Sequence, residues 1–343
     1  MKKKAILTLT FMFFSLVSCN TKDINKKTVP VSADVFAMDT YMNLKAYTDG
    51  DESALKEAEA RINELENELS TTSDSSDIWK IDHSNGNEVT VSNDSAVLIK
   101  KAMEVGSSTN GALDITIFPV LKEWGFTTGE YHIPDKAKLD TLLSNVDYSS
   151  INLNSNIVTI PENTEIDLGA LAKGYTGDEV MEIFKAHGID SAIISLGGNV
   201  QALGSKPDGS YWKVAVRDPF SPEKDMCVVE IKNKAVITSG NYERFFTGDD
   251  GNNYWHILDP ADGYPADNGF VSVTVIGENG LDCDCLSTAL FVAGMDGYKK
   301  IISNYPDYDF IFVTDEEKIY YTKGIADRFQ NISSMNAEVI AVD

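Results

Sequence analysis

Cysteine and histidine are scarce in this sequence, and their scarcity excludes several kinds of site. The 343 residues contain four cysteines and four histidines. Beyond Cys19, the cysteines are Cys227, Cys283 and Cys285, which are too few and too unevenly spaced for a disulfide framework or a zinc cluster. Cys283 and Cys285 are expected to pack as small side chains near the start of a helix.

Positive charge is also in short supply, since 29 lysines and arginines stand against 53 acidic residues. Residues 1–18 hold three lysines and no acid, so the chain without them has 26 basic and 53 acidic residues, a charge of −27. Such a charge repels nucleic-acid phosphates, which excludes DNA or RNA as a partner. An anionic dinucleotide would need local cations in order to bind, and a divalent metal is one way to supply them.

The short motifs of common nucleotide-binding and hydrolytic sites are absent as well. The sequence has no G-x-x-x-x-G-K-[ST], no G-x-G-x-x-G, no H-E-x-x-H and no G-x-S-x-G. It also has no internal repeat and no low-complexity block. A phosphate-binding loop, a dinucleotide fingerprint, a zinc protease and a nucleophile elbow are therefore not predicted.

What is present begins with an export signal. Three lysines, Lys2–Lys4, precede an apolar run over 5–17 that is shorter than a permanent membrane span. Leu16-Val17-Ser18-Cys19 resembles the lipobox of bacterial lipoproteins, so Cys19 is expected to be acylated once the signal peptide, residues 1–18, has been removed. The alternatives are a plain signal peptide or a buried N-terminal helix.

The predicted organisation follows from this start. Residues 19–32 are polar and lysine-rich, which favours a lipidated tether, and residues 33–343 are predicted to form the folded domain. The lipid would hold the protein at the bacterial cell membrane, facing the periplasm or the exterior. The lipid would have to be the anchor, because the acidic surface repels anionic lipid headgroups.

The folded part mixes helical and strand patterns. Apolar residues at helical spacing predict helices, and alternating or β-branched runs predict strands. The predicted helices cover 52–69, 94–107, part of 131–147, 169–186 and 286–293, and the predicted strands cover 33–47, 151–153, 157–160, 191–196, 213–217, 227–231, 235–238, 255–258, 270–276, 310–314 and 319–322. Strands that mostly meander, with helices between them, predict an α+β domain.

Three oxygen-bearing side chains stand out near the last predicted helix. Asp284, Ser287 and Thr288 share one helix face, because positions i, i+3 and i+4 are neighbours. Hard oxygen ligands of this kind suit Mg²⁺, with positions left open for phosphate oxygens. The alternative is helix capping, in which Asp282 or Asp284 caps the helix and Thr288 bonds back to its own turn. This segment alone favours capping.

Two further segments are weak when each is taken alone. In the segment Asp167–Tyr175, Lys173 lies early in a predicted helix and would pair with an anion near the positive helix end. The alternative is that Lys173 is an ordinary surface lysine. His256 lies beside a predicted strand and a Pro/Gly turn, a suitable place for a general base.

Together these segments resemble the ApbE family, the FAD:protein FMN transferases, over about residues 35–313. The matching motifs, in the family's order, are Met38-Asp39-Thr40, Leu69-Ser70 to Ser76, Gly111–Thr116, Trp124–Phe126, Asp167–Tyr175, Leu196–Asn199, Thr238–Gly240, His256–Pro260 and Asp284 with Thr288. Three positions depart from the family pattern. Asp39 stands where the family usually has Gly, Thr72 where an aromatic often stacks on the flavin, and Leu113 where an aromatic or Met is commoner.

The resemblance implies an ApbE-type, T-fold-like α+β fold, a single domain of two intimate lobes. It also implies FAD as the substrate and Mg²⁺ as the cofactor. The FAD contacts it implies are Met38, Thr72, Ala112, Leu113, Asp114, Asp167, Lys173 and Leu258. The Mg²⁺ ligands it implies are the Ala170 carbonyl and the side chains of Asp284, Ser287 and Thr288, so the metal site is preferred over capping.

The reaction implied is attack of a Thr or Ser hydroxyl of a partner protein on the FMN-side phosphorus, with release of AMP. His256 is the candidate base, and Asp284 is the second candidate. Expected acceptors are Rnf- or Nqr-type redox subunits or extracytosolic flavoproteins. Two alternatives stay open: an FAD pyrophosphatase that yields FMN and AMP, and a non-catalytic flavin-binding lipoprotein.

The lipobox leads to a first prediction. Cys19→Ala removes the only predicted acylation site, so the variant should leave the membrane fraction for the soluble fraction. Fractionation and mass spectrometry of the mature N-terminus check this. An unmodified Cys19 in the parent, together with unchanged fractionation of the variant, would contradict it.

Overall fold

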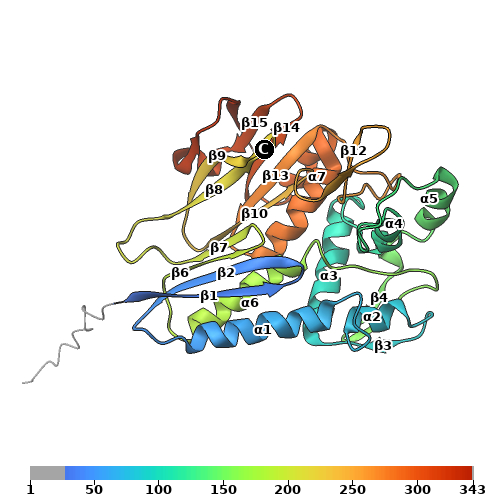
Figure 1. Ribbon diagram of the computed structural model, residues 1–343, viewed down its shortest axis with the longest axis horizontal. Coiled ribbons are helices and arrows are strands. Elements are labelled where there is room, and N and C mark those ends of the chain that lie inside the picture. The colour runs from blue at the N-terminus through green and yellow to red at the C-terminus, as the bar shows by residue number, and fades with distance from the viewer. Residues whose placement is uncertain (1–27, 342–343) are drawn as a thin grey trace, which may run out of the picture.

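The computed structural model describes residues 28–341 and is built around a nine-stranded sheet (Figure 1). Neighbouring strands are antiparallel, except that β17 pairs with β15 in parallel. In spatial order the strands are β1 (Val29–Ala37), β2 (Thr40–Thr48), β6 (Ala192–Leu196), β7 (Asn199–Leu203), β10 (Lys234–Gly240), β13 (Phe270–Gly277), β14 (Asp309–Thr314), β15 (Lys318–Thr322) and β17 (Asn336–Ile340).

Three smaller sheets complete the strand inventory of the described chain. One contains β16 (Phe329–Asn331), β9 (Ser221–Ile231) and β8 (Trp212–Asp218). A second contains β3 (Val89–Thr90), β5 (Ile157–Thr159) and β4 (Asn152–Asn154), and a hairpin contains β11 (Phe245–Thr247) and β12 (Asn253–Trp255).

The helices are α1 (Ser53–Leu69), α2 (Asp77–Asp82), α3 (Asn93–Ser108), α4 (Phe118–Glu123), α5 (Lys136–Leu143), α6 (Ala172–Ala186) and α7 (Gly280–Ile302), with 3-10 turns η1 (Ile115–Ile117), η2 (Tyr148–Ser150) and η3 (Lys323–Arg328). Three of the helices, α1, α6 and α7, pack against the large sheet, and the others belong to the region beside it. Helices and sheet together confirm the predicted α+β class.

The large sheet is the middle layer of one lobe. On its helical face, α1 and α6 cover β1, β2 and β6, while α7 covers β10, β13 and β14. On the opposite face, the sheet of β8, β9 and β16 encloses a second apolar layer that includes Trp212 and Met226. All eight residues of β13 are therefore buried.

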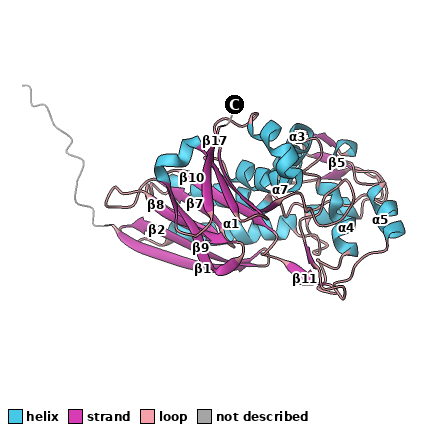
Figure 2. Ribbon diagram, turned by 90° about the horizontal axis from the view of Figure 1, so that it is seen from above, coloured by secondary structure: helices cyan, strands magenta, loops and turns pink. Residues whose placement is uncertain are grey.

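A second lobe, mostly helical, lies beside the sheet (Figure 2). Its main core joins α2, α3 and the end of α1 to residues from the starts of α6 and α7. A smaller aromatic core forms around Trp124 and Phe126. Because α1, α6 and α7 contribute to the cores of both lobes, the lobes are packed directly against each other.

Several element boundaries differ from the sequence prediction. The strand predicted over 33–47 is a hairpin, because Met38 and Asp39 take positive φ values of 51° and 56° and turn the chain. β1 also begins at Val29, inside the predicted 19–32 tether. The helix predicted over 286–293 runs over 280–302, with a break at Gly294 (φ 59°, ψ −163°) where it was expected to end.

The predicted signal peptide and Cys19 lie outside the described residues. Within residues 28–341, none of the helices has the length and hydrophobicity that a membrane crossing requires.

Helices α6 and α7 meet at a glycine. A Cβ on Gly174 would overlap the Gly280 carbonyl oxygen and lie 2.7 Å from the Asp284 Cβ. The contact is reinforced from α6, where the Asp178 carboxylate accepts the N–H groups of Gly280 and Leu281 at 2.8 and 2.9 Å. Only glycine at 174 lets the start of α7 approach α6 this closely.

This contact leads to a prediction about stability. Gly174→Ala should lower the free energy of unfolding by roughly 1–3 kcal/mol, because the added methyl group overpacks the contact. Glu182→Ala, on the exposed face of the same helix, is the control and should change it by less than about 0.5 kcal/mol. Urea unfolding of both variants measures the difference, and equal midpoints would contradict the prediction.

Candidate active site

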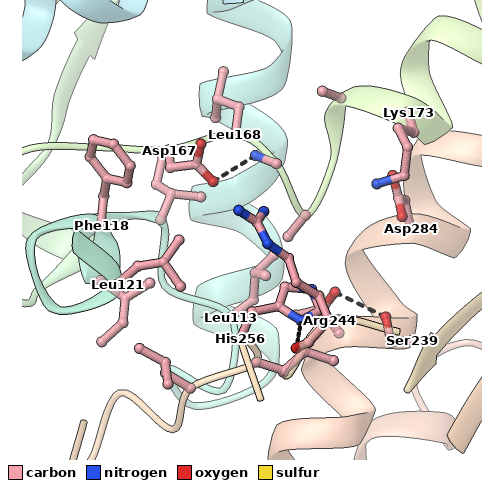
Figure 3. A pocket seen from close by; sticks show the side chains of 18 of the residues that line it. Leu113, Phe118, Leu121, Asp167, Leu168, Lys173, Ser239, Arg244, His256 and Asp284 are labelled. Atoms are coloured by element: carbon pink, nitrogen blue, oxygen red, sulfur yellow. Dashed lines mark hydrogen bonds between the residues drawn. The ribbon is translucent and has the colours of Figure 1, made fainter. Parts of the chain in front are cut away.

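A cavity of about 480 Å³ lies where the two lobes meet (Figure 3). Segments far apart in the sequence line it: the β1–β2 turn, the chain after α1, the segment around η1, the start of α6, the loop after β10, the segment 256–260 and one face of α7. The cavity brings together all but one of the predicted site residues: Met38, Thr72, Ala112, Leu113, Asp114, Asp167, Ala170, Lys173, His256, Leu258, Asp284 and Thr288.

Asp284 is a carboxylate inside α7, 5% exposed, at the wall of this cavity. Its Oδ2 accepts the Gly174 N–H at 2.8 Å, and its Oδ1 accepts the Asn199 side-chain amide at 3.1 Å. Burial raises the pKa of Asp284, and the positive charge of Lys173 and these two hydrogen bonds oppose that rise. The carboxylate is therefore held in one orientation by α6 and β7.

The alternative prediction, that Asp282 or Asp284 caps α7, is wrong. The helix begins at Gly280, and the side chain of Asn279 caps it by accepting the Asp282 N–H at 2.8 Å. Asp284 instead supplies an acceptor to a different helix, since Gly174 lies in the first turn of α6 and Leu171 at its N-cap provides no side-chain hydrogen bond. The carboxylate is thus tied to the positive end of α6.

The hydroxyl groups next to Asp284 differ in position. Thr288 lines the cavity, and its Oγ1 lies 3.2 Å from the Ser239 Oγ. Ser287 is fully buried and does not line the cavity; its hydroxyl donates to the Asp284 carbonyl at 2.9 Å and contacts the Ser239 Oγ at 2.8 Å. The structure therefore does not support the predicted ligand role of Ser287, because its hydroxyl faces the packing between α7 and β10.

Asp284, Thr288 and Ala170 line the cavity together, and their oxygens are the donor types that Mg²⁺ prefers. One buried carboxylate with hydroxyl and carbonyl neighbours leaves room for phosphate oxygens. The residues present thus fit a magnesium ion that also contacts a nucleotide. Within residues 28–341, no group of three or more His, Cys, Asp or Glu side chains could hold a metal, so a protein-only cage of such residues is not formed there.

Lys173 and Arg244 are the lysine and arginine among the described lining residues. Lys173 is the second residue of α6, at the positive end of that helix, where the N–H groups of Ala172 and Gly174 already donate to the Leu168 carbonyl and to Asp284. Its charge acts on Asp167, Asp284 and His256, so it lies within reach of both sides of the cavity. A cation combined with a helix N-terminus is a favourable environment for phosphate.

Two acids line the opposite wall in different ways. Asp114 is 8% exposed and accepts hydrogen bonds from Thr116 and Tyr148, so it mainly fixes the backbone around η1. Asp167 accepts the Gly169 N–H at 2.9 Å through Oδ1, as Figure 3 shows. Burial raises the pKa of Asp167, and the charges of Lys173 and Arg244 oppose that rise.

His256 has one defined ring tautomer. Its Nδ1 lies 3.2 Å from the Arg244 carbonyl oxygen, which only accepts hydrogen bonds, so Nδ1 carries the proton and Nε2 is free to accept one. Its backbone N–H donates to the same oxygen at 3.1 Å. The surrounding protein lowers the pKa of His256 to about 4, mainly by excluding water, so the ring is neutral at pH 7.

The remaining residues that were predicted to contact FAD form parts of the cavity wall. Leu113 and Leu258 are 3% and 5% exposed and face the cavity from two segments, with Met38 and Ala112 packed beside them. Thr72 lies on the loop after α1, where its Oγ1 contacts the Ser70 Oγ at 3.2 Å. Because this position has no aromatic, small polar side chains, Ser70, Thr71 and Thr72, form this part of the cavity wall.

Sequence reasoning missed Arg244. Its guanidinium donates to the Phe126 carbonyl oxygen, which links the loop after β10 to the helical lobe. The contact between Asp284 and Asn199, which belongs to the Leu196–Asn199 motif, was also not predicted from the sequence. Glycine and serine around 239–241 marked a loop close to the ligand, but a single arginine three residues further on gave no signal of its own.

Comparison with known proteins identifies the family of this chain. The ApbE family model matches residues 38–312. An FAD:protein FMN transferase of Treponema pallidum (strain Nichols) is 30% identical over 294 residues, covering 80% of this chain and 81% of that protein. One of Klebsiella pneumoniae (strain 342) is 32% identical over 296 residues, covering 85% and 91%.

Solved structures show the same fold. The crystal structure of the ApbE protein of Thermotoga maritima has a TM-score of 0.79 at 30% identity, covering 85% of this chain and 96% of that one. The apo form of Pseudomonas stutzeri flavinyl transferase ApbE has a TM-score of 0.75 at 27% identity, covering 86% and 93%. The fold and the relatives together define a transferase enzyme. The chain belongs to the ApbE family.

The protonation state of His256 leads to a prediction. The unfolded chain binds a proton at this residue near pH 6.5, but the folded chain binds it only near pH 4, so acidification from pH 7 to 5 favours unfolding through His256. His256→Gln removes this contribution, and its Tm should fall less than that of the parent between pH 7 and 5. Equal falls in thermal melts of the two proteins would show that His256 titrates normally.

Proposed function

We propose that this protein transfers FMN from FAD to a Thr or Ser hydroxyl of an acceptor protein and releases AMP, with Mg²⁺ as the cofactor. The observation that carries this proposal is one cavity that combines a lysine at a helix N-terminus, a neutral histidine and an oriented buried carboxylate. The relatives named FAD:protein FMN transferase support the same reaction.

Binding of the pyrophosphate is the first requirement. FAD brings negative charge to a protein whose net charge is −24, so attraction has to be local. Lys173, at the positive end of α6, would supply it on one side, and Arg244 would supply it on the other. The apolar walls at Leu113 and Leu258 suit the flavin or adenine rings.

The magnesium ion would be held by Asp284, Thr288 and the Ala170 carbonyl. When bound, it would neutralise phosphate oxygens and the negative charge that develops on the leaving group. The contribution of the protein is orientation: the Gly174 N–H and the Asn199 amide hold both oxygens of Asp284, which cannot rotate without losing a hydrogen bond.

The nucleophile has to lose a proton. In the proposed step, Nε2 of His256 accepts the proton of the acceptor hydroxyl while its oxygen bonds to the FMN-side phosphorus. The bond from this phosphorus to the bridging oxygen breaks, and AMP leaves with that oxygen. The Arg244 carbonyl keeps the accepting nitrogen unprotonated beforehand. Asp284 is the second candidate base, but both of its oxygens already accept hydrogen bonds.

One assay separates this proposal from its two alternatives. The protein is incubated with FAD, Mg²⁺ and a purified Rnf- or Nqr-type redox subunit or extracytosolic flavoprotein, our proposed acceptors. Transfer gives a fluorescent acceptor band that survives denaturation. An FAD pyrophosphatase would give free FMN and AMP with an unlabelled acceptor, and a flavin-binding protein would leave FAD intact; either outcome would overturn the proposal.

We also propose that the protein works at the outer side of the bacterial cell membrane, held by acylated Cys19. What supports this is the lipobox and the preceding apolar run in the sequence. A lipid anchor would place the cavity close to membrane-embedded redox subunits, which are the proposed acceptors.

Asp284 provides the sharpest prediction for this function. Asp284→Asn keeps the shape but removes the charge, so transfer should fall roughly 10²–10³-fold, and Mg²⁺ should no longer raise the Tm. Asp296→Asn, on the exposed part of the same helix, is the matched control and should behave like the parent. If Asp284 were only a cap for α6, its variant would lose about 1 kcal/mol of stability and keep full activity.

A further inference from the structure

The β1–β2 hairpin carries two exposed aromatic side chains on its outer face. Phe36 is 72% exposed and Tyr41 is 61% exposed, the highest values among the exposed large hydrophobic residues of the described chain. The two residues are directly opposite each other in the strand register, so their side chains form one patch. Neighbouring Val35, Ala37 and Met42 point the other way, into the core.

This patch is directly connected to the cavity. Met38 and Asp39, the turn residues between the two strands, both line the cavity. The turn is held in place because the Met38 N–H donates to Glu66 at 2.9 Å and the Gly197 N–H donates to the Tyr41 carbonyl at 3.1 Å. Figure 1 shows the tip of this hairpin reaching toward the helical lobe, and Phe36 and Tyr41 each lie two residues from a turn residue that lines the cavity.

A third exposed aromatic flanks the cavity from another element. Phe245, 46% exposed, follows Arg244, which lines the cavity. The other exposed aromatic residues of the described chain, Tyr131, Tyr211 and Phe220, do not adjoin a lining segment in this way. Three of the six exposed aromatics of the described chain therefore lie within two residues, along the sequence, of a residue that lines the cavity.

We propose that Phe36 and Tyr41 are the docking surface for the acceptor protein, and this inference rests on the proposed function. The occupant would be an apolar segment of the acceptor next to its reactive Thr or Ser. Aromatic side chains carry much of the binding energy in protein interfaces. Asp34 and Asp39 lie beside the pair, so a cationic group on the acceptor segment would complement the patch.

The fold favours an extended segment as the occupant. β1 is an edge strand of the nine-stranded sheet, so one side of its backbone is open to pairing with an added strand. An anionic membrane surface is disfavoured by the two aspartates and by the net charge of −24. A second copy of the chain would meet the same repulsion.

The double variant Phe36→Ser/Tyr41→Ser tests the proposal with an Rnf- or Nqr-type redox subunit that the parent labels. The KM for this acceptor should rise about tenfold or more, since each removed aromatic is a buried contact in the complex. The Kd for FAD, measured by calorimetry, and kcat at saturating acceptor should stay within about twofold. Phe220→Ser, an exposed aromatic far from the lining segments in sequence, is the matched control.

The outcomes separate the two proposals. An unchanged acceptor KM in the double variant, with an unchanged Tm, would overturn the docking surface and leave the transferase function standing. An equal rise in KM for Phe220→Ser would also overturn it, because the effect would then be non-specific. If the parent itself left every acceptor unlabelled while cleaving FAD, the transferase function would fail, and the docking proposal with it.

Discussion

The site depends on one buried carboxylate shared by three elements. Asp284 belongs to α7, accepts a hydrogen bond from the first turn of α6 through Gly174, and accepts another from Asn199 on β7. An acidic group that is 5% exposed is unfavourable unless hydrogen bonds and a cation stabilise its charge. The close approach of α6 and α7, made possible by Gly174, supplies the hydrogen bonds and brings Lys173 close.

This arrangement reconciles the net charge with the ligand. The chain carries 53 acidic residues, and the cavity lining includes Asp39, Glu66, Asp114, Asp167, Glu243 and Asp284. Lys173 and Arg244 are the two cations beside them that would attract the proposed pyrophosphate. Attraction is therefore short-ranged, while the rest of the surface repels nucleic acid and anionic lipid. A divalent cation at Asp284 would add positive charge beside these two cations, and His256, the proposed base, lines the same cavity from another segment.

The sequence predicted most of the fold and nearly all of the cavity, for identifiable reasons. Helix α1 and strand β13 follow from periodicity, and the family motifs marked segments that converge in space. It did not predict the turn at Met38–Asp39, since two non-glycine residues with positive φ give no local signal. Nor did it predict that Ser287 faces away from the cavity, because helical spacing defines a face but not what packs against it.

The same limit explains the capping question. The residues before Ser287 include two aspartates and an asparagine, each a good cap, and only the observed start of α7 shows that Asn279 has this role. Arg244 and the tautomer of His256 also depend on contacts between segments distant from one another, such as Arg244 with Phe126. Such contacts are properties of the folded chain, and local patterns do not contain them.

We propose that Asp284 holds a divalent cation against the phosphates of FAD. Mn²⁺ in place of Mg²⁺ tests it directly, because its unpaired electrons report nearby phosphorus nuclei in a pulsed electron spin resonance experiment. The account predicts a phosphorus coupling when FAD is added to the Mn²⁺-loaded protein, and its loss in Asp284→Asn. A Mn²⁺ spectrum that is the same with and without FAD, under conditions where FAD is bound, would contradict it.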